Sequence, residues 1–156
     1  MKRLFTCAFI FIGGLSLLLG CTKNGAIPVP NNTMSAQIGT IQFNSTGNDV
    51  KVWTAANWLD TLKTAFFISA TMDVGSNVLS YVQIVILDYD NTNLVGTYSV
   101  SSSEAIGVYN AGLSGEDFFI DGSVVITKSG SIISGTFHGT TQSGIIISNG
   151  TFSVEF

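Results

Sequence analysis

The sequence holds few of the side chains that enzymes most often use for chemistry. Its 156 residues include one histidine and two cysteines, and 10% of them are charged. Zinc sites and Ser–His or Cys–His nucleophile systems need a histidine with suitably placed partners. His138 stands among threonine, phenylalanine and glycine, and we interpret it as an ordinary strand residue. We therefore expect no catalytic residue, no metal site and no cofactor.

The acidic residues do not form a recognisable site either. Residues 88–93 carry aspartates at alternate positions, but they lack the glycine and the distal glutamate of a calcium loop. We expect a hairpin turn there. Glu116 and Asp117 are adjacent, and adjacent residues of a strand point to opposite faces. They are therefore not expected to form the facing carboxyl pair of a glycosidase.

Positive charge is also scarce. The chain has 6 lysines and arginines against 10 acidic residues, which gives a net charge of −4. A chain of this kind lacks the basic patch that binds nucleic acid. The glycines match neither a P-loop nor a dinucleotide fingerprint. These observations exclude nucleic acid as a partner and give no support to a nucleotide cofactor.

The first residues have the pattern of an export signal. Lys2 and Arg3 precede an apolar run over residues 4–19, as in a secretory signal. The run is shorter than the roughly 20 apolar residues of a spanning helix, and Leu18-Leu19-Gly20-Cys21 resembles a lipobox. We predict that residues 1–20 are a lipoprotein signal peptide and that Cys21 carries the lipid. An ordinary signal with a chance cysteine and an uncleaved anchor are the alternatives.

Residues 21–34 contain both prolines of the chain, with glycine and several asparagines, and predict a flexible tether. No acid directly follows Cys21. In some Bacteroidota lipoproteins, acidic residues at this position resemble a surface-export signal. Because this chain lacks them, we expect an outer-membrane location facing the periplasm, with surface exposure as the alternative. The remaining acidic domain would be repelled by anionic lipid. Its membrane contact is therefore expected through the lipid anchor alone.

Residues 35–156 are rich in Ile, Val, Thr, Phe, Ser and Gly, which favour strands and turns. Short alternating runs bounded by turn residues predict an all-β domain: an antiparallel β-sandwich or a partly open β-barrel of eight to nine strands. Turns are expected at 90–93, Ser129-Gly130 and Asn149-Gly150. The expected strands are 36–43, 50–54, 64–73, 79–88, 94–100, 118–128, 132–140, 143–149 and 151–156.

Several short motifs carry a resemblance to a known group of proteins. They are Met34-Ser35-Ala36, Trp53, Gly96-Thr97-Tyr98, Ser134-Gly135-Thr136-Phe137, the stretch from Asn149 to Val154, and the terminal Phe156. Together they resemble a family of small, uncharacterised Bacteroidota envelope lipoproteins with an all-β domain of unknown function. The resemblance implies an envelope location and this fold, and it implies no activity.

Aromatic residues are the remaining candidates for ligand contact. Trp53 and Trp58 flank a polar segment, and an exposed indole there can stack on a sugar ring. We expect Trp53 in the core. Trp58, with Asn57 and Asp60, is the candidate ligand-contact site, and an ordinary packed loop is the alternative for these residues. The leading interpretation is a non-catalytic binding or structural accessory module with a glycan or an envelope protein as partner. The alternative is a lipocalin-like carrier of a small apolar ligand, which needs an enclosed cavity of about 300 Å³ or more.

Overall fold

The computed structural model describes residues 31–56, 64–73, 79–87, 94–112, 115–129 and 131–156, and these form an all-β protein. Nine antiparallel strands follow one another in the order β2-β1-β10-β9-β8-β7-β5-β4-β3, and β6 pairs with β8 beside this path. The strands are β1 (Thr33–Ile38), β2 (Ile41–Thr46), β3 (Val50–Ala55), β4 (Ala65–Asp73), β5 (Leu79–Ile86), β6 (Gly96–Ser99), β7 (Ala105–Asn110), β8 (Glu116–Ser129), β9 (Ile132–Thr141) and β10 (Ile146–Glu155).

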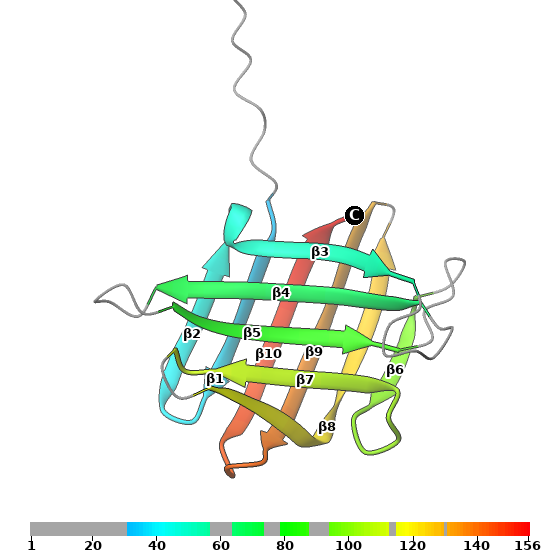
Figure 1. The fold of residues 1–156 in the computed structure, drawn as a ribbon. Helices are drawn as coiled ribbons and strands as arrows, with labels where there is room; N and C mark the ends of the chain where they lie inside the picture. Colours follow the sequence, from blue (N-terminus) through cyan, green and yellow to red (C-terminus); the bar gives the residue numbers. More distant parts are fainter. Residues whose placement is uncertain (1–30, 57–63, 74–78, 88–93, 113–114, 130) are drawn as a thin grey trace, which may run out of the picture.

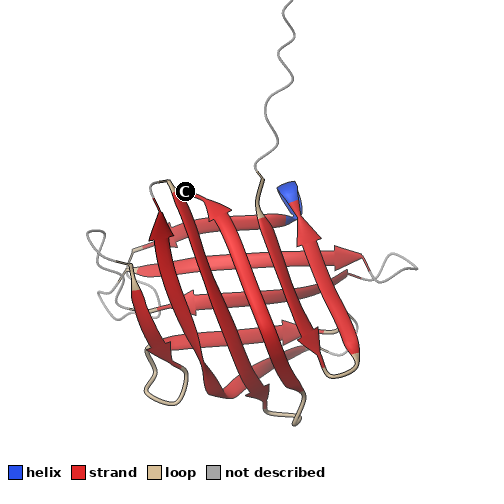
Figure 2. Cartoon of the chain, turned by 180° about the vertical axis from the view of Figure 1, so that it is seen from behind, coloured by secondary structure: helices blue, strands red, loops and turns tan. Residues whose placement is uncertain are grey.

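The strands form two layers that cross at a steep angle (Figures 1 and 2). One layer holds β3, β4, β5 and β7, and the other holds β2, β1, β10, β9 and most of β8, with β6 beside it. The long strand β8 belongs to both layers, because its first residues pair with β7 and the rest pair with β9. A bulge between Phe119 and Asp121 marks the change of layer, and bulges bend strands in this way. The predicted class, an antiparallel β-sandwich or a partly open β-barrel, is confirmed: the nine-stranded path is nearly closed as a barrel.

The interior is filled by the inward side chains of both layers. Along β1 the buried residues alternate with less buried ones, as expected for a strand with one face in the core. The largest fully buried side chains are Met34, Phe43, Ile126, Ile133, Phe137 and Ile147 from one layer and Val50, Phe66, Ile68, Val82, Ile84 and Ile86 from the other. The two layers therefore pack directly against each other.

Phe119 fills the corner where β8 changes layer. It is 7% exposed, and its ring lies against Gly107 of β7 and Gly139 of β9. A Cβ atom built on Gly139 would lie 2.5 Å from the Phe119 ring. The two glycines therefore make the space that the ring occupies.

The barrel has one seam, between the two ends of the strand order. β2 and β3 are joined by a short 3-10 helix, η1 (Gly47–Asp49), but they are not paired with each other. Asn32 links the strands beside the seam: its Nδ2 donates to Val50 O at 3.2 Å, and its Oδ1 accepts from Glu155 N at 2.8 Å. Its side chain therefore connects β3 with β10.

Three strand predictions need correction. Residues 36–43 were expected to form one strand, but Gly39, with a φ of 55°, turns the chain between β1 and β2. The expected strands 143–149 and 151–156 are one strand, β10, because Asn149 lies in a bulge instead of a hairpin turn. Strand β7 was not predicted at all. Its central Gly107 weakens the apolar pattern that predicts a strand.

The described sheet begins at Thr33, inside the segment expected to be the tether, and Met34 is buried in the core. The signal peptide, Cys21 and the rest of the tether before residue 31 lie outside the described residues. Among the described residues, no helix is long and apolar enough to span a membrane.

Candidate functional site: an open groove on the outer sheet

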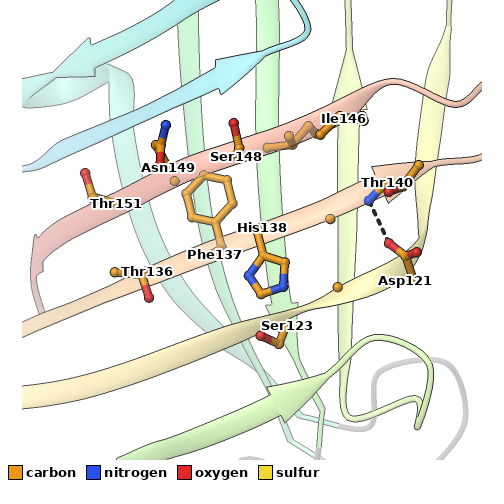
Figure 3. A pocket seen from close by; sticks show the side chains of 14 residues that line it. Asp121, Ser123, Thr136, Phe137, His138, Thr140, Ile146, Ser148, Asn149 and Thr151 are labelled. Carbon is orange, nitrogen blue, oxygen red and sulfur yellow. Dashed lines mark hydrogen bonds between the residues drawn. The ribbon is translucent and has the colours of Figure 1, made fainter.

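An open hollow of about 1060 Å³ lies on the outer surface of β8, β9 and β10 (Figure 3). Its position follows from the alternation along β9, where Phe137 faces the core and Thr136 and His138 are exposed. Ser123 of β8 lies directly opposite His138, and Ser148 and Asn149 of β10 line the other side. We call this hollow the outer groove.

Two bulges border the outer groove, one on each neighbour of β9. In β10, Ser148 and Asn149 together stand opposite His138, because Ile147 pairs with Gly139 and Gly150 pairs with Phe137. Asn149 has a φ of 52°, a left-handed conformation that asparagine adopts more readily than most residues. Bulges re-aim side chains and are frequent beside functional sites. The arrangement directs polar groups of three strands toward one hollow.

Five polar side chains of the outer groove make no hydrogen bond to another described residue. Within the part of the chain that the structure describes, the side chains of Ser123, Thr136, His138, Ser148 and Asn149 have no hydrogen-bond partner. Thr136, His138 and Asn149 are exposed, and Ser123 and Ser148 are half-buried. These hydroxyl, amide and imidazole groups are therefore available to water or to a ligand.

The outer groove also brings together the residue types of a hydrolytic triad, namely Ser123, His138 and Asp121. Their contacts are not those of a triad, in which the acid orients the imidazole and the imidazole binds the hydroxyl. Asp121 Oδ1 instead accepts from Thr140 N at 2.9 Å. This hydrogen bond holds the bulge of β8 against β9. Among the described residues, no group of three or more His, Cys, Asp and Glu side chains is placed to hold a metal ion.

A second hollow, of about 480 Å³, lies beside Asp117 and Ser143. Ser143 N donates to Asp117 Oδ1 at 3.2 Å, and Ser143 Oγ donates to Asp117 Oδ2. Partial burial raises the pKa of Asp117, but hydrogen bonds from Ser143, Thr141 and Gln142 outweigh it and hold this pKa below its ordinary value. Neighbouring Glu116 binds a different partner, Tyr81, whose hydroxyl donates to Glu116 Oε1 at 2.6 Å. The two carboxylates therefore serve separate structural contacts.

The predicted ligand-contact residues Asn57, Trp58 and Asp60 lie outside the described residues. The expectation that Trp53 belongs to the core is wrong: its side chain is 38% exposed. Its indole stacks on the ring of Phe67, with centroids 4.9 Å apart and planes 5° from parallel. Phe67 is its cross-strand neighbour on β4, so the pair lies on the outer face of that layer.

Sequence reasoning missed the outer groove. The sequence pattern that could have indicated it is the alternation Thr136-x-His138, which places both side chains on one face of a strand. The prediction of a turn at Asn149-Gly150 does not place Asn149 beside His138, where the bulge of β10 puts it. The chain was compared with models of protein families, with curated proteins and with solved structures, and none of them matches it.

Proposed function

We propose that the chain is a lipoprotein of the cell envelope, anchored by a lipid on Cys21, and that its β-domain is a non-catalytic binding module. The anchor rests on Lys2, Arg3, the apolar run over residues 4–19 and the lipobox-like Leu18–Cys21. The expected location is the outer membrane, facing the periplasm. A protein held in this way can bring a bound partner to the membrane surface without penetrating it.

One observation carries the binding role: the outer groove gathers five polar side chains that have no hydrogen-bond partner among the described residues, on strands that are hydrogen-bonded on both edges. β9 pairs with β8 along one edge and with β10 along the other. Sites built on the paired strands of a scaffold hold their side chains more firmly than sites on loops. Such a surface suits recognition, because its donors and acceptors are in place before a ligand arrives.

The interior supports a surface-binding module over a carrier of a small apolar ligand. A carrier needs an enclosed space of about 300 Å³ or more. Here large side chains of both layers, such as Phe43, Phe66 and Phe137, meet between the layers and are less than 2% exposed. The contacts of Asp121, His138 and Ser123 likewise give no reason to propose hydrolysis.

The anchor is tested with a fatty-acid analogue such as alkynyl palmitate in cells that produce the full chain. The wild type should become labelled and should be found in the membrane fraction. The variant Cys21→Ser should stay uncleaved and unlabelled, and Cys7→Ser, which changes the cysteine inside the signal, should label normally. Labelling of Cys21→Ser at the wild-type level would refute the anchor.

The non-catalytic role is tested on purified full chain with a fluorophosphonate probe, which reacts with activated serines. We expect no labelling of Ser123. Labelling that disappears in Ser123→Ala and His138→Ala would make the protein a hydrolase and would overturn this part of the proposal.

A further inference from the structure

We infer that the outer groove is a binding site for a neutral glycan chain. The inference rests on the proposed function, because it names the ligand class of that binding module. It starts from the uncharged polar side chains Ser123, Thr136, Ser148 and Asn149, which surround His138 on three neighbouring strands. Adjacent strands lie about 4.8 Å apart, so these groups present donors and acceptors at short, regular intervals across the sheet.

The chemistry of these groups matches that of a sugar. A serine or threonine hydroxyl donates one hydrogen bond and accepts others, and an asparagine amide does both through separate atoms. Sugar hydroxyls have the same double capacity, so either partner can adjust to the other. A neutral ligand also loses less hydration energy than an ion when it enters such a groove.

Several hydroxyls on the same sheet face, outside these five side chains, are bonded within the protein. Ser35 Oγ lies 2.9 Å from Thr151 Oγ1, and Ser134 Oγ donates to Ser153 Oγ at 3.3 Å. Thr127 Oγ1 donates to the carbonyl oxygen of Ser134 at 3.0 Å. The five groove side chains, which have no hydrogen-bond partner among the described residues, therefore lie beside hydroxyls that are already bonded.

The groove has few features that a peptide or a polyanion would use. A peptide that adds as a strand needs an unpaired strand edge, and both edges of β9 are occupied. A polyanion needs lysine or arginine, and neither is among the residues that line the groove. The lining includes one carboxylate, Asp121, which is bonded to the backbone of Thr140.

The groove also offers apolar contacts for the C–H faces of sugar rings. Ile146 is 64% exposed at one end, and the imidazole of His138 provides a flat ring at the centre (Figure 3). The hollow of about 1060 Å³ exceeds the upper range of about 1000 Å³ for small-molecule pockets. It is open at the surface, so a chain of several sugar units can lie along it.

Binding is measured with full-length protein purified in detergent, by calorimetric titration and by affinity electrophoresis. The probes are three neutral glycans (maltoheptaose, laminarin and galactomannan) and one charged glycan, polygalacturonate. At least one neutral glycan should bind, and polygalacturonate should bind more weakly than that glycan. Failure of all three neutral glycans to bind, or preferential binding of polygalacturonate, would overturn the inference.

The groove variants are Thr136→Val, Asn149→Gly and His138→Ala. Thr136→Val removes a hydroxyl but keeps the branched shape, and Asn149→Gly keeps the left-handed backbone of the bulge. Each should raise the dissociation constant about five- to tenfold, which is the effect of losing one hydrogen bond or ring contact. The matched control Thr127→Val removes a hydroxyl that is already bonded on the same sheet face, and it should bind as the wild type does.

Melting temperatures show whether each variant is folded. If Thr136→Val and Asn149→Gly are folded and bind the glycan like the wild type, the groove is not the site, although the binding module would stand. Loss of binding in the groove variants alone supports the inference. Reaction of Ser123 with the fluorophosphonate probe would refute the non-catalytic function, which is a separate outcome from failure of glycan binding.

Discussion

The ring of Phe156 packs edge-on against the ring of Phe66, with centroids 5.4 Å apart and planes at 75°. Phe66 is fully buried on β4, whereas Phe156 follows the last residue of β10 and is 49% exposed. β4 and β10 belong to different layers and do not pair. The contact therefore joins the two layers near the seam, where the end strands β2 and β3 are not paired with each other.

Replacing Phe156 with alanine should lower the free energy of unfolding by about 1–2 kcal/mol, because an aromatic pair contributes about 0.5–1.5 kcal/mol beyond area burial. Urea denaturation followed by circular dichroism measures the change. Phe118→Ala is the control, since that side chain is 40% exposed and has no ring contact among the described residues. An equal loss in both variants would show that the contact with Phe66 adds nothing.

The variant Asn32→Ala should lose about 2–3 kcal/mol of stability. The side chain of Asn32 is 6% exposed and bonds Val50 O and Glu155 N. Removing it takes away one buried and one partly buried hydrogen bond, and a buried group that loses its partner costs about 1–3 kcal/mol. The exposed Asn44 on β2 offers a comparison, and Asn44→Ala should change stability by less than about 0.5 kcal/mol. Similar melting temperatures for Asn32→Ala and the wild type would contradict this role.

Gly139→Ala should destabilise the domain by about 1–3 kcal/mol or more, the usual range for overpacking. A Cβ at this position would lie 2.5 Å from Phe119 Cδ2 and 2.7 Å from Asp121 O, so the corner of β8 must move. At Gly96 of β6 the added Cβ meets its nearest atom at 3.5 Å. Gly96→Ala should therefore be well tolerated. The same denaturation assay compares the two, and equal stability would show that the corner yields easily.

Much of the fold was predictable because inward and outward residues alternate along the strands. β4 and β9 were predicted to within one residue at each end. β7 was missed because Gly107, at its centre, looks like a turn residue in the sequence. A glycine is needed at this position because the Phe119 ring of β8 packs against it. A contact between residues that are distant in the sequence cannot be recognised from the local sequence.

The outer groove illustrates the same limit. Asn149-Gly150 has the sequence of a hairpin turn, and a bulge uses the same left-handed conformation. Only the pairing of β10 with β9 distinguishes the two, since it places Ser148 and Asn149 opposite His138. That register depends on the whole sheet, so the site was not predictable even though its residue types were visible.

The hydrogen bonds between Ser143 and Asp117 should make stability depend on pH. They favour the ionised carboxylate and lower its pKa. A carboxylate with a lowered pKa stabilises the fold above its unfolded pKa of about 3.9, and this contribution is lost as pH falls through the folded pKa. The variant Asp117→Asn should therefore be less stable than the wild type by about 1 kcal/mol at pH 6, and the gap should close near pH 2.

Urea denaturation at both pH values measures that gap. Asp49→Asn is the matched control, because the exposed Asp49 side chain accepts no hydrogen bond from the described residues. Its difference from the wild type should stay small at pH 6 and at pH 2. Asparagine keeps the shape and one oxygen of the aspartate but cannot ionise. A gap for Asp117→Asn that persists unchanged at low pH would therefore mean that the second acceptor oxygen, and not the charge, holds the Ser143 turn against β8.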